Sequence, residues 1–204
     1  MVAKYLNFGG FVSPSTIDWP GKSVSVVFFR GCGMGCPYCH NKHICTGLDQ
    51  RELKEIEDMI LEASSLTSGV VFSGGECTEQ MGALNRLTEV CKRHKIPVGI
   101  YTNGSNADVI DRLVQRDMVD FISLDIKTTW DRYQELIGEY KAVFVPSIKI
   151  CLRDCTEAFK KGKLKEFRVA YTAYDTSIIE EVRGQIDPSV PFIVQEVRLP
   201  HSHC

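Results

Sequence analysis

Short apolar runs alternate along this chain with segments whose apolar residues recur every three or four positions. Continuous runs rich in β-branched residues are typical of parallel strands that are covered on both faces. We therefore expect strands at residues 24–29, 70–72, 97–101, 119–124, 167–171 and 192–195, and a short edge strand at 8–12.

The amphipathic segments between these runs predict helices. The expected helices begin at Asp49 and Thr78, cover about 108–114, run from Thr129 to near Gly138 and from Ser147 to Phe159, and lie near 178–186. Asp49 and Glu52 have the spacing of a capping box, and Gly138 suits the position after a helix C-terminus.

Strand, loop and helix thus alternate about six times, which favours parallel strands joined by right-handed crossovers. Six such units are fewer than the eight that close a full barrel. Because no linker-like composition interrupts the pattern, we expect one α/β domain over residues 1–204. Within it, residues 1–22 are expected to form an N-terminal strap and residues 23–204 the body of the domain.

Composition argues against a nucleic-acid-binding, a membrane-spanning and a secreted protein. The 204 residues carry a net charge of −2, which gives no broad electrostatic case for binding nucleic acid. No apolar run approaches the roughly 20 residues that span a bilayer, and the first residues lack the apolar core of a secretory signal. Nine cysteines without export indicate a reducing compartment, so we expect a cytoplasmic protein.

The most distinctive stretch, residues 29–41, holds three cysteines directly after a predicted strand. Cys32, Cys36 and Cys39 are spaced C-x3-C-x2-C. Three thiolates can bind three irons of one [4Fe–4S] cluster and leave the fourth iron open. A structural zinc site is the alternative, with His40 or Cys45 as its fourth ligand.

Three further motifs stand at the ends of predicted strands, where ligand sites of α/β proteins gather. The first is Ser73-Gly74-Gly75-Glu76, whose glycines allow a ligand to lie against bare backbone and whose carboxylate can accept from an ammonium group. The second is Thr102-Asn103-Gly104. The third is the pair Asp125 and Lys127, whose opposite charges suit a zwitterion.

The cysteine triplet resembles the signature of the radical S-adenosylmethionine (SAM) superfamily. Together with Asp18-Trp19-Pro20-Gly21-Lys22 and with His40-Asn41, it is similar to the activating enzymes of glycyl-radical enzymes. Within these, it most resembles the activators of anaerobic (class III) ribonucleotide reductase. The resemblance covers nearly the whole chain and implies a partial (β/α)6 barrel with parallel strands, open on one side for a large partner.

The resemblance also implies roles for individual residues. Cys32, Cys36 and Cys39 would hold one [4Fe–4S] cluster. The SAM contacts would be Tyr38 for the adenine, Gly74, Gly75 and Glu76 for the methionine amino group, Thr102 and Asn103 near the ribose or methionine, and Asp125 and Lys127. Arg168 matches a position that faces SAM or the partner's glycine loop. Cys77 stands where the family usually has proline, which leaves that loop less rigid.

The remaining cysteines do not indicate a second cluster. Cys91, Cys151 and Cys155 occupy apolar helix faces, where a thiol behaves as a small hydrophobe. Cys45 and Cys77 are expected close to the cofactor. The stretch His201-Ser202-His203-Cys204 has the composition of a metal-binding tract, although a frayed end is the commoner case.

The function implied by the resemblance is reductive cleavage of SAM to methionine and a 5′-deoxyadenosyl radical, which removes a hydrogen atom from a glycine of the partner. The expected partners are a glycyl-radical enzyme, specifically anaerobic ribonucleotide reductase, and an electron donor of the flavodoxin or ferredoxin type. Two alternatives remain open: radical SAM chemistry on a small molecule, as in a deazapurine-type synthase, and a non-catalytic zinc-binding interaction module.

Overall fold

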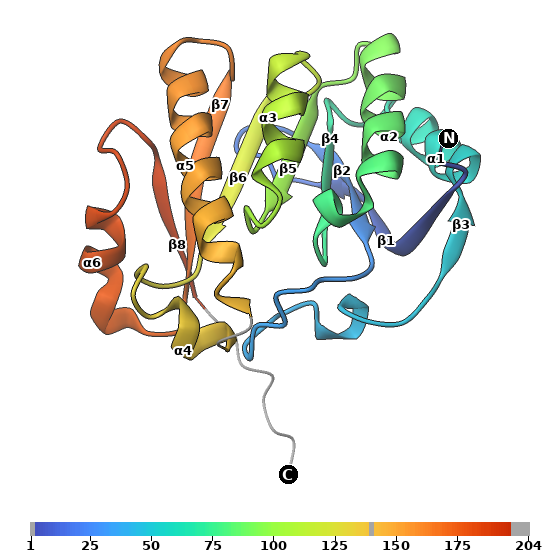
Figure 1. The fold of residues 1–204 in the computed structure, drawn as a ribbon. Helices are drawn as coiled ribbons and strands as arrows, with labels where there is room; N and C mark the ends of the chain where they lie inside the picture. Colours follow the sequence, from blue (N-terminus) through green and yellow to red (C-terminus); the bar gives the residue numbers. More distant parts are fainter. Residues whose placement is uncertain (1–2, 139–140, 197–204) are drawn as a thin grey trace.

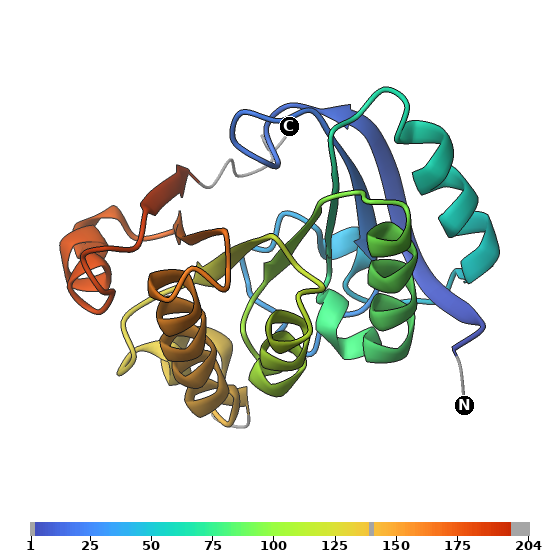
Figure 2. The ribbon, with the colours of Figure 1, turned by 90° about the horizontal axis from the view of Figure 1, so that it is seen from above.

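The computed structural model describes residues 3–138 and 141–196, which form a curved sheet with helices on its convex face (Figures 1 and 2). The strands are β1 (Tyr5–Ser15), β2 (Val24–Phe29), β3 (Gln50–Glu52), β4 (Val70–Gly74), β5 (Val98–Thr102), β6 (Phe121–Ile126), β7 (Glu166–Ala173) and β8 (Phe192–Glu196). Their order in the sheet is β3-β1-β2-β4-β5-β6-β7-β8. From β2 onward, neighbouring strands are parallel, which confirms the expected α/β fold with six parallel strands.

The α-helices are α1 (Leu53–Ala63), α2 (Met81–Arg93), α3 (Ala107–Gln115), α4 (Tyr133–Ile137), α5 (Phe144–Lys160) and α6 (Ile179–Gly184). Seen from above in Figure 2, the outside of the curve is lined by α1, α2, α3 and α5, and none of these four helices lies on the inside. A large apolar core lies between these helices and the sheet. No helix within the described part of the chain is both long and apolar enough to cross a membrane.

A second, smaller core fills the concave side of the sheet near the beginnings of the parallel strands. It consists of Trp19, Val24, Val26, Val71 and Phe121. The Trp19 side chain is fully buried, and its indole N–H donates to the Glu166 carboxylate at 2.9 Å. The concave side is therefore packed with side chains near the beginnings of the strands, and space for a site is left at the strand C-termini.

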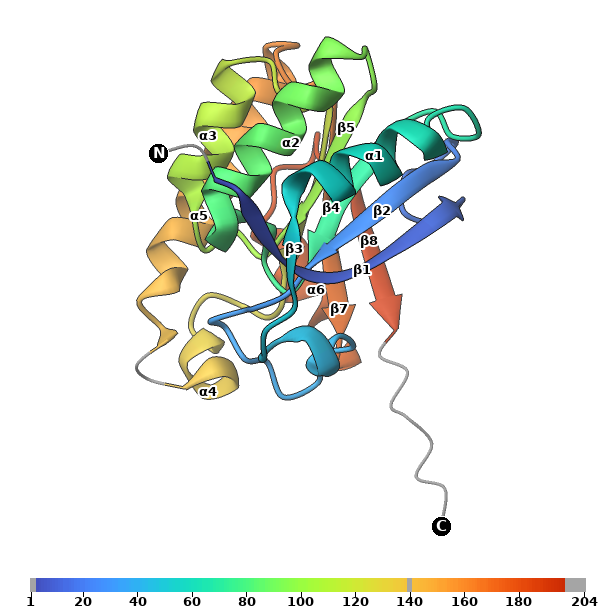
Figure 3. The same ribbon diagram turned by 90° about the vertical axis from the view of Figure 1, so that its right-hand side faces the viewer.

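The N-terminal segment contributes more of the sheet than expected. The edge strand predicted at 8–12 is β1, which covers residues 5–15 and pairs antiparallel with β2 (Figure 3). The helix predicted from Asp49 begins only at Leu53, so the capping box prediction was wrong. The reason is pairing with β1: the Phe8 N–H donates to the Asp49 carbonyl at 2.8 Å, and residues 50–52 continue as β3.

Three other helix starts also differ from the prediction. The helix expected from Thr78 begins at Met81, because residues 77–80 form a short 3₁₀ helix that the Glu76 side chain caps. The helix expected from Thr129 begins at Tyr133, although it ends as predicted at Gly138, whose φ is 88°. The helix expected from Ser147 begins at Phe144. The Ser147 hydroxyl caps a different helix, since it accepts a hydrogen bond from the Ala107 N–H at 3.0 Å. The predicted tract 201–204 lies outside the described residues.

Candidate active site

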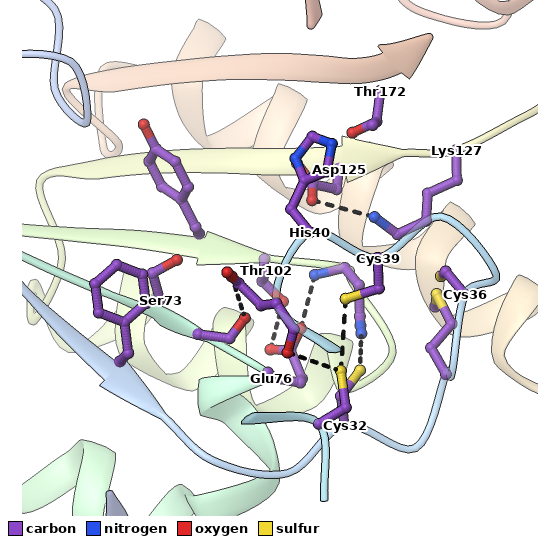
Figure 4. Close-up of a pocket in the computed structure, with 18 of the residues that line it drawn as sticks. Cys32, Cys36, Cys39, His40, Ser73, Glu76, Thr102, Asp125, Lys127 and Thr172 are labelled. Carbon is purple, nitrogen blue, oxygen red and sulfur yellow. Dashed lines mark hydrogen bonds and ion pairs between the residues drawn. The ribbon is translucent and has the colours of Figure 1, made fainter. Parts of the chain in front are cut away.

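A pocket of about 440 Å³ opens at the C-terminal ends of the parallel strands. The cysteine loop forms one wall, the ends of β4 through β8 form most of the others, and residues 17 and 18 after β1 and Phe28 of β2 complete the lining (Figure 4). Eleven of the twelve residues predicted for the site line this one pocket: Cys32, Cys36, Tyr38, Cys39, Gly74, Gly75, Glu76, Thr102, Asn103, Asp125 and Lys127. The fold therefore gathers these residues, and their individual roles stay predictions.

The glycines at the end of β4 join two loops of the site. The Gly75 N–H donates to the Phe29 carbonyl and the Glu76 N–H to the Gly31 carbonyl, both at 2.8 Å. A Cβ at Gly75 would lie 2.0 Å from the Gly31 oxygen, and one at Gly74 would lie 2.3 Å from the Phe29 oxygen. These glycines are thus required for backbone contact with the cysteine loop, in addition to any contact with a ligand.

Glu76 is the buried centre of a hydrogen-bond network. Its Oε1 accepts from the Thr78 hydroxyl at 2.6 Å and from the Thr102 hydroxyl at 2.9 Å, while its Oε2 accepts from the Asn103 N–H at 2.7 Å. Burial raises the pKa of Glu76, although these donors favour the carboxylate and oppose the increase. The network ties the ends of β4 and β5 together, and Oε2, with one donor, retains capacity for a ligand ammonium.

The three cysteines of the loop have the donor chemistry of an iron–sulfur site. Among residues 3–138 and 141–196, no three His, Cys, Asp or Glu side chains lie close enough to share one ion. A [4Fe–4S] cluster takes its thiolates on different irons, so its ligands need not meet at one point. Cys32, Cys36 and Cys39 all face the pocket, so the donor set and its position fit a cluster with one side open toward the remaining space.

Asp125 and Lys127, at the end of β6, form an ion pair beside the cysteine loop, with Nζ and Oδ2 3.2 Å apart. Burial by itself would lower the pKa of Lys127, but the negative charge of Asp125 outweighs it and the pKa is raised. Lys127 is therefore a cation at neutral pH. A zwitterionic ligand can replace this internal pair with two new ones, because it offers each side chain an opposite charge.

Tyr38 lies at the rim of the pocket beside this pair. Its hydroxyl donates to the Lys127 carbonyl at 3.2 Å, which fixes the position of the ring. Tyr174 stacks on one face of the ring, with centroids 4.9 Å apart and planes 8° apart. A base that contacts Tyr38 would therefore use the other face or the edge of the ring.

Arg168 is the one predicted residue that does not line the pocket. It lies on the concave side, nearer than the pocket to the beginnings of the strands. There its Nε donates to the Ser123 hydroxyl at 3.0 Å and its guanidinium donates to the Tyr101 hydroxyl. Tyr101 does line the pocket and donates to the Asp18 carbonyl. Any influence of Arg168 on a ligand would thus pass through Tyr101.

The pocket also contains residues that the sequence analysis did not assign to it. They include Ile17, Asp18, Tyr101, Thr172 and Gln195. Tyr101 precedes Asn103 by two positions, and Thr172 and Gln195 stand near the ends of the last two strands. The alternation of side chains along a strand was therefore a usable signal for all three.

The cysteines outside the triplet divide into two groups. Cys45 lines the pocket, as expected. Cys77 is buried beside it, with its sulfur 3.6 Å from the Tyr101 carbonyl. Cys91, Cys151 and Cys155 are buried in α2 and α5, as their apolar helix faces predicted.

Comparison with known families agrees with this geometry. The radical SAM superfamily profile matches residues 26–163, which is more than half of the chain. The chain belongs to the radical SAM superfamily. Membership implies a [4Fe–4S] cluster and SAM as cofactors, and the pocket supplies the three thiols and the polar groups that these two require.

Two relatives of this chain are named as activating enzymes. MJ1227 of Methanocaldococcus jannaschii, provisionally named a glycyl-radical enzyme activating enzyme, is 36% identical over 129 residues, which cover 63% of this chain and 53% of the relative. The pyruvate formate-lyase 1-activating enzyme of Escherichia coli K12 is 32% identical over 139 residues, covering 63% and 55%. The chain thus spans about half the length of the curated relatives it matches.

Solved structures show the same fold at low sequence identity. QueE from Escherichia coli superposes with a TM-score of 0.53 at 12% identity, covering 94% of each chain. The anSMEcpe structure with bound AdoMet and the Cp18Cys peptide gives 0.57 at 17% identity, covering 82% of this chain and 48% of the other. At these identities the likeness concerns the fold alone.

Proposed function

We propose that this chain is a cytoplasmic activase that generates a glycyl radical in a partner enzyme, specifically anaerobic ribonucleotide reductase. The observation that carries the proposal is the pocket that joins the cysteine triplet to the buried network around Glu76 and the pair Asp125–Lys127. The names of the two relatives described above support the glycyl-radical partner.

The pocket residues have defined tasks in this proposal. When bound, the cluster supplies the electron for reductive cleavage of SAM to methionine and a 5′-deoxyadenosyl radical. Lys127 would bind the methionine carboxylate, while Asp125 and the free capacity of Glu76 would bind its ammonium group. These contacts hold the reacting end of SAM against the cysteine loop and limit its motion.

The shape of the sheet supports a macromolecular substrate. In the described part of the chain, the strands at its two ends are β3 and β8, and these do not pair with each other. Figure 2 shows β8 and the turn that follows β1 at two sides of the concave face. A glycine on an extended loop of a partner could enter there, because glycine carries no side chain that would collide with the walls.

The choice of a glycyl-radical partner rests on residues 18–22 and on His40-Asn41, and the choice of the reductase rests on the resemblance of the chain to that group of activators. Asp18 and His40 line the pocket, where they would meet an entering loop. Trp19 and Lys22 instead belong to the packed end of the concave side, where the ammonium of Lys22 lies 3.8 Å from the Trp19 ring centroid. Asn41 donates to the Gly74 carbonyl at 3.2 Å and so holds the two loops together.

The test is anaerobic reconstitution with iron and sulfide, followed by SAM and a strong reductant, or reduced flavodoxin or ferredoxin as the proposed physiological donor. We expect 5′-deoxyadenosine to form, and a glycyl-radical EPR doublet to appear when the host's anaerobic reductase is added. Cys36→Ser serves as the matched control and should abolish both signals. Nucleoside without the doublet would refute the reductase as partner, and zinc binding without SAM cleavage would refute the enzymatic proposal altogether.

A further inference from the structure

Cys45 is joined to two of the three cluster cysteines, although it lies outside the triplet. Its sulfur is 3.5 Å from the Cys39 sulfur, within hydrogen-bond range for two sulfur atoms. Its carbonyl accepts a hydrogen bond from the Cys32 N–H at 3.1 Å. Cys45 is only partly exposed and lines the pocket. One residue thus contacts the backbone of the first ligand and the thiol of the third.

Asn103 makes a similar contact from the other side of the pocket. Its Nδ2 lies 3.7 Å from the Cys32 sulfur. The orientation of the amide is fixed, because Oδ1 accepts from the Ser105 N–H at 2.9 Å and this leaves the NH₂ group toward the sulfur. The Asn103 backbone N–H is held in turn by Glu76.

We propose that Cys45 and Asn103 are positioning residues that donate hydrogen bonds to Cys39 and Cys32 and raise the reduction potential of the cluster. The proposal depends on the cluster that superfamily membership implies, and it is independent of the partner proposed above. Both donors reach sulfur atoms that would be cluster ligands.

The direction of the effect follows from charge. Reduction adds an electron to the cluster and its thiolates, so donors aimed at the sulfurs stabilise the reduced state more than the oxidised state. Hydrogen bonds to the sulfurs are among the features that set the potential of iron–sulfur clusters. The Cys45 thiol also lies 3.4 Å from the Asn41 carbonyl, but a ligand thiolate is the stronger acceptor because it carries negative charge.

The variants remove each donor without adding a charge. Asn103→Ala removes the NH₂ donor and leaves the backbone N–H that Glu76 holds. Cys45→Ala removes the thiol, whereas Cys45→Ser keeps a hydroxyl donor. Cys91→Ala is the matched control, since Cys91 is a buried thiol of α2 and does not belong to the pocket.

Each reconstituted protein is characterised first by iron and sulfide per chain and then by an EPR-monitored redox titration. We expect full clusters throughout, lower midpoint potentials for Cys45→Ala and Asn103→Ala, a smaller decrease for Cys45→Ser, and no change for Cys91→Ala. Unchanged potentials in Cys45→Ala and Asn103→Ala would overturn the proposal. Loss of iron from both Cys45 variants, with circular dichroism still showing a folded protein, would also overturn it, because Cys45 would then be a ligand.

Discussion

Replacing Gly75 with alanine tests whether the join between β4 and the cysteine loop is as tight as the structure shows. Gly75 has no unusual backbone angle, so the effect of a methyl group is steric alone. The added Cβ would lie 2.0 Å from the Gly31 oxygen, and the two segments would have to separate. Separation breaks the bonds from Gly75 to Phe29 and from Glu76 to Gly31.

The magnitude follows from these losses. Two backbone hydrogen bonds contribute about 2 kcal/mol together, and the displacement of packed backbone adds about 1 kcal/mol or more. We therefore expect the free energy of unfolding of the cluster-free protein to fall by about 3 kcal/mol. With a urea slope of about 2 kcal/mol/M, the midpoint would move down by roughly 1.5 M.

The assay is urea unfolding followed by circular dichroism, with Gly184→Ala as the matched control. Gly184 ends α6, and a Cβ added there would meet no atom within 4 Å. Alanine at this position should leave stability unchanged or increase it by up to ~1 kcal/mol. Equal midpoints for Gly75→Ala and the control would refute the argument that these loops are joined through the glycine.

Three further changes test other parts of the structure. Trp19→Ala should lower the free energy of unfolding by about 3–5 kcal/mol, because it leaves a cavity in the small core on the concave side. Thermal or urea unfolding measures this, and a loss below about 1 kcal/mol would contradict the packing described. Lys127→Met should weaken SAM binding about 10- to 100-fold in equilibrium dialysis while iron content stays constant, since it removes the cation for the carboxylate; unchanged affinity would exclude this contact. Burial would raise the pKa of Asp120, but Lys165 and Lys92 outweigh burial and lower it. The ionised Asp120 carboxylate therefore stabilises the folded protein above the unfolded pKa, and this stabilisation is lost as pH falls through the folded pKa. Asp120→Asn should therefore cost about 1–2 kcal/mol at pH 7 and less near pH 3, whereas Asp108→Asn, at an exposed helix pair, should change little at either pH; an equal loss at both pH values would count against the charge argument.

Much of this structure could be predicted from the sequence because its main signals are local. The apolar runs placed all six parallel strands, since strands buried on both faces leave continuous hydrophobic segments. The cysteine spacing and the strand-end motifs located the site, because parallel strands bring their C-termini to one edge.

The misplaced elements depend on contacts that are distant in sequence. Residues 50–52 extend because β1 pairs with them, and nothing within that segment reveals the partner. Ser147 reads locally as a helix start, but its hydroxyl binds the beginning of α3. Arg168 was expected to face SAM or the partner's glycine loop, and the structure holds it outside the pocket lining, against the rings of Tyr101 and Phe121 and the Ser123 hydroxyl.

The iron ligands of the pocket lie close together in the sequence, whereas its SAM-binding residues lie far apart. The chain can therefore bind iron before it can bind SAM. The three cysteines fall within eight residues, so the ligand loop is complete when little of the chain has been synthesised. Asp125, Lys127 and Gln195 reach the pocket only after most of the sheet has formed. During synthesis or refolding, iron ligation can therefore precede SAM binding, and during unfolding the affinity for SAM should be lost while the cysteine loop still retains its metal.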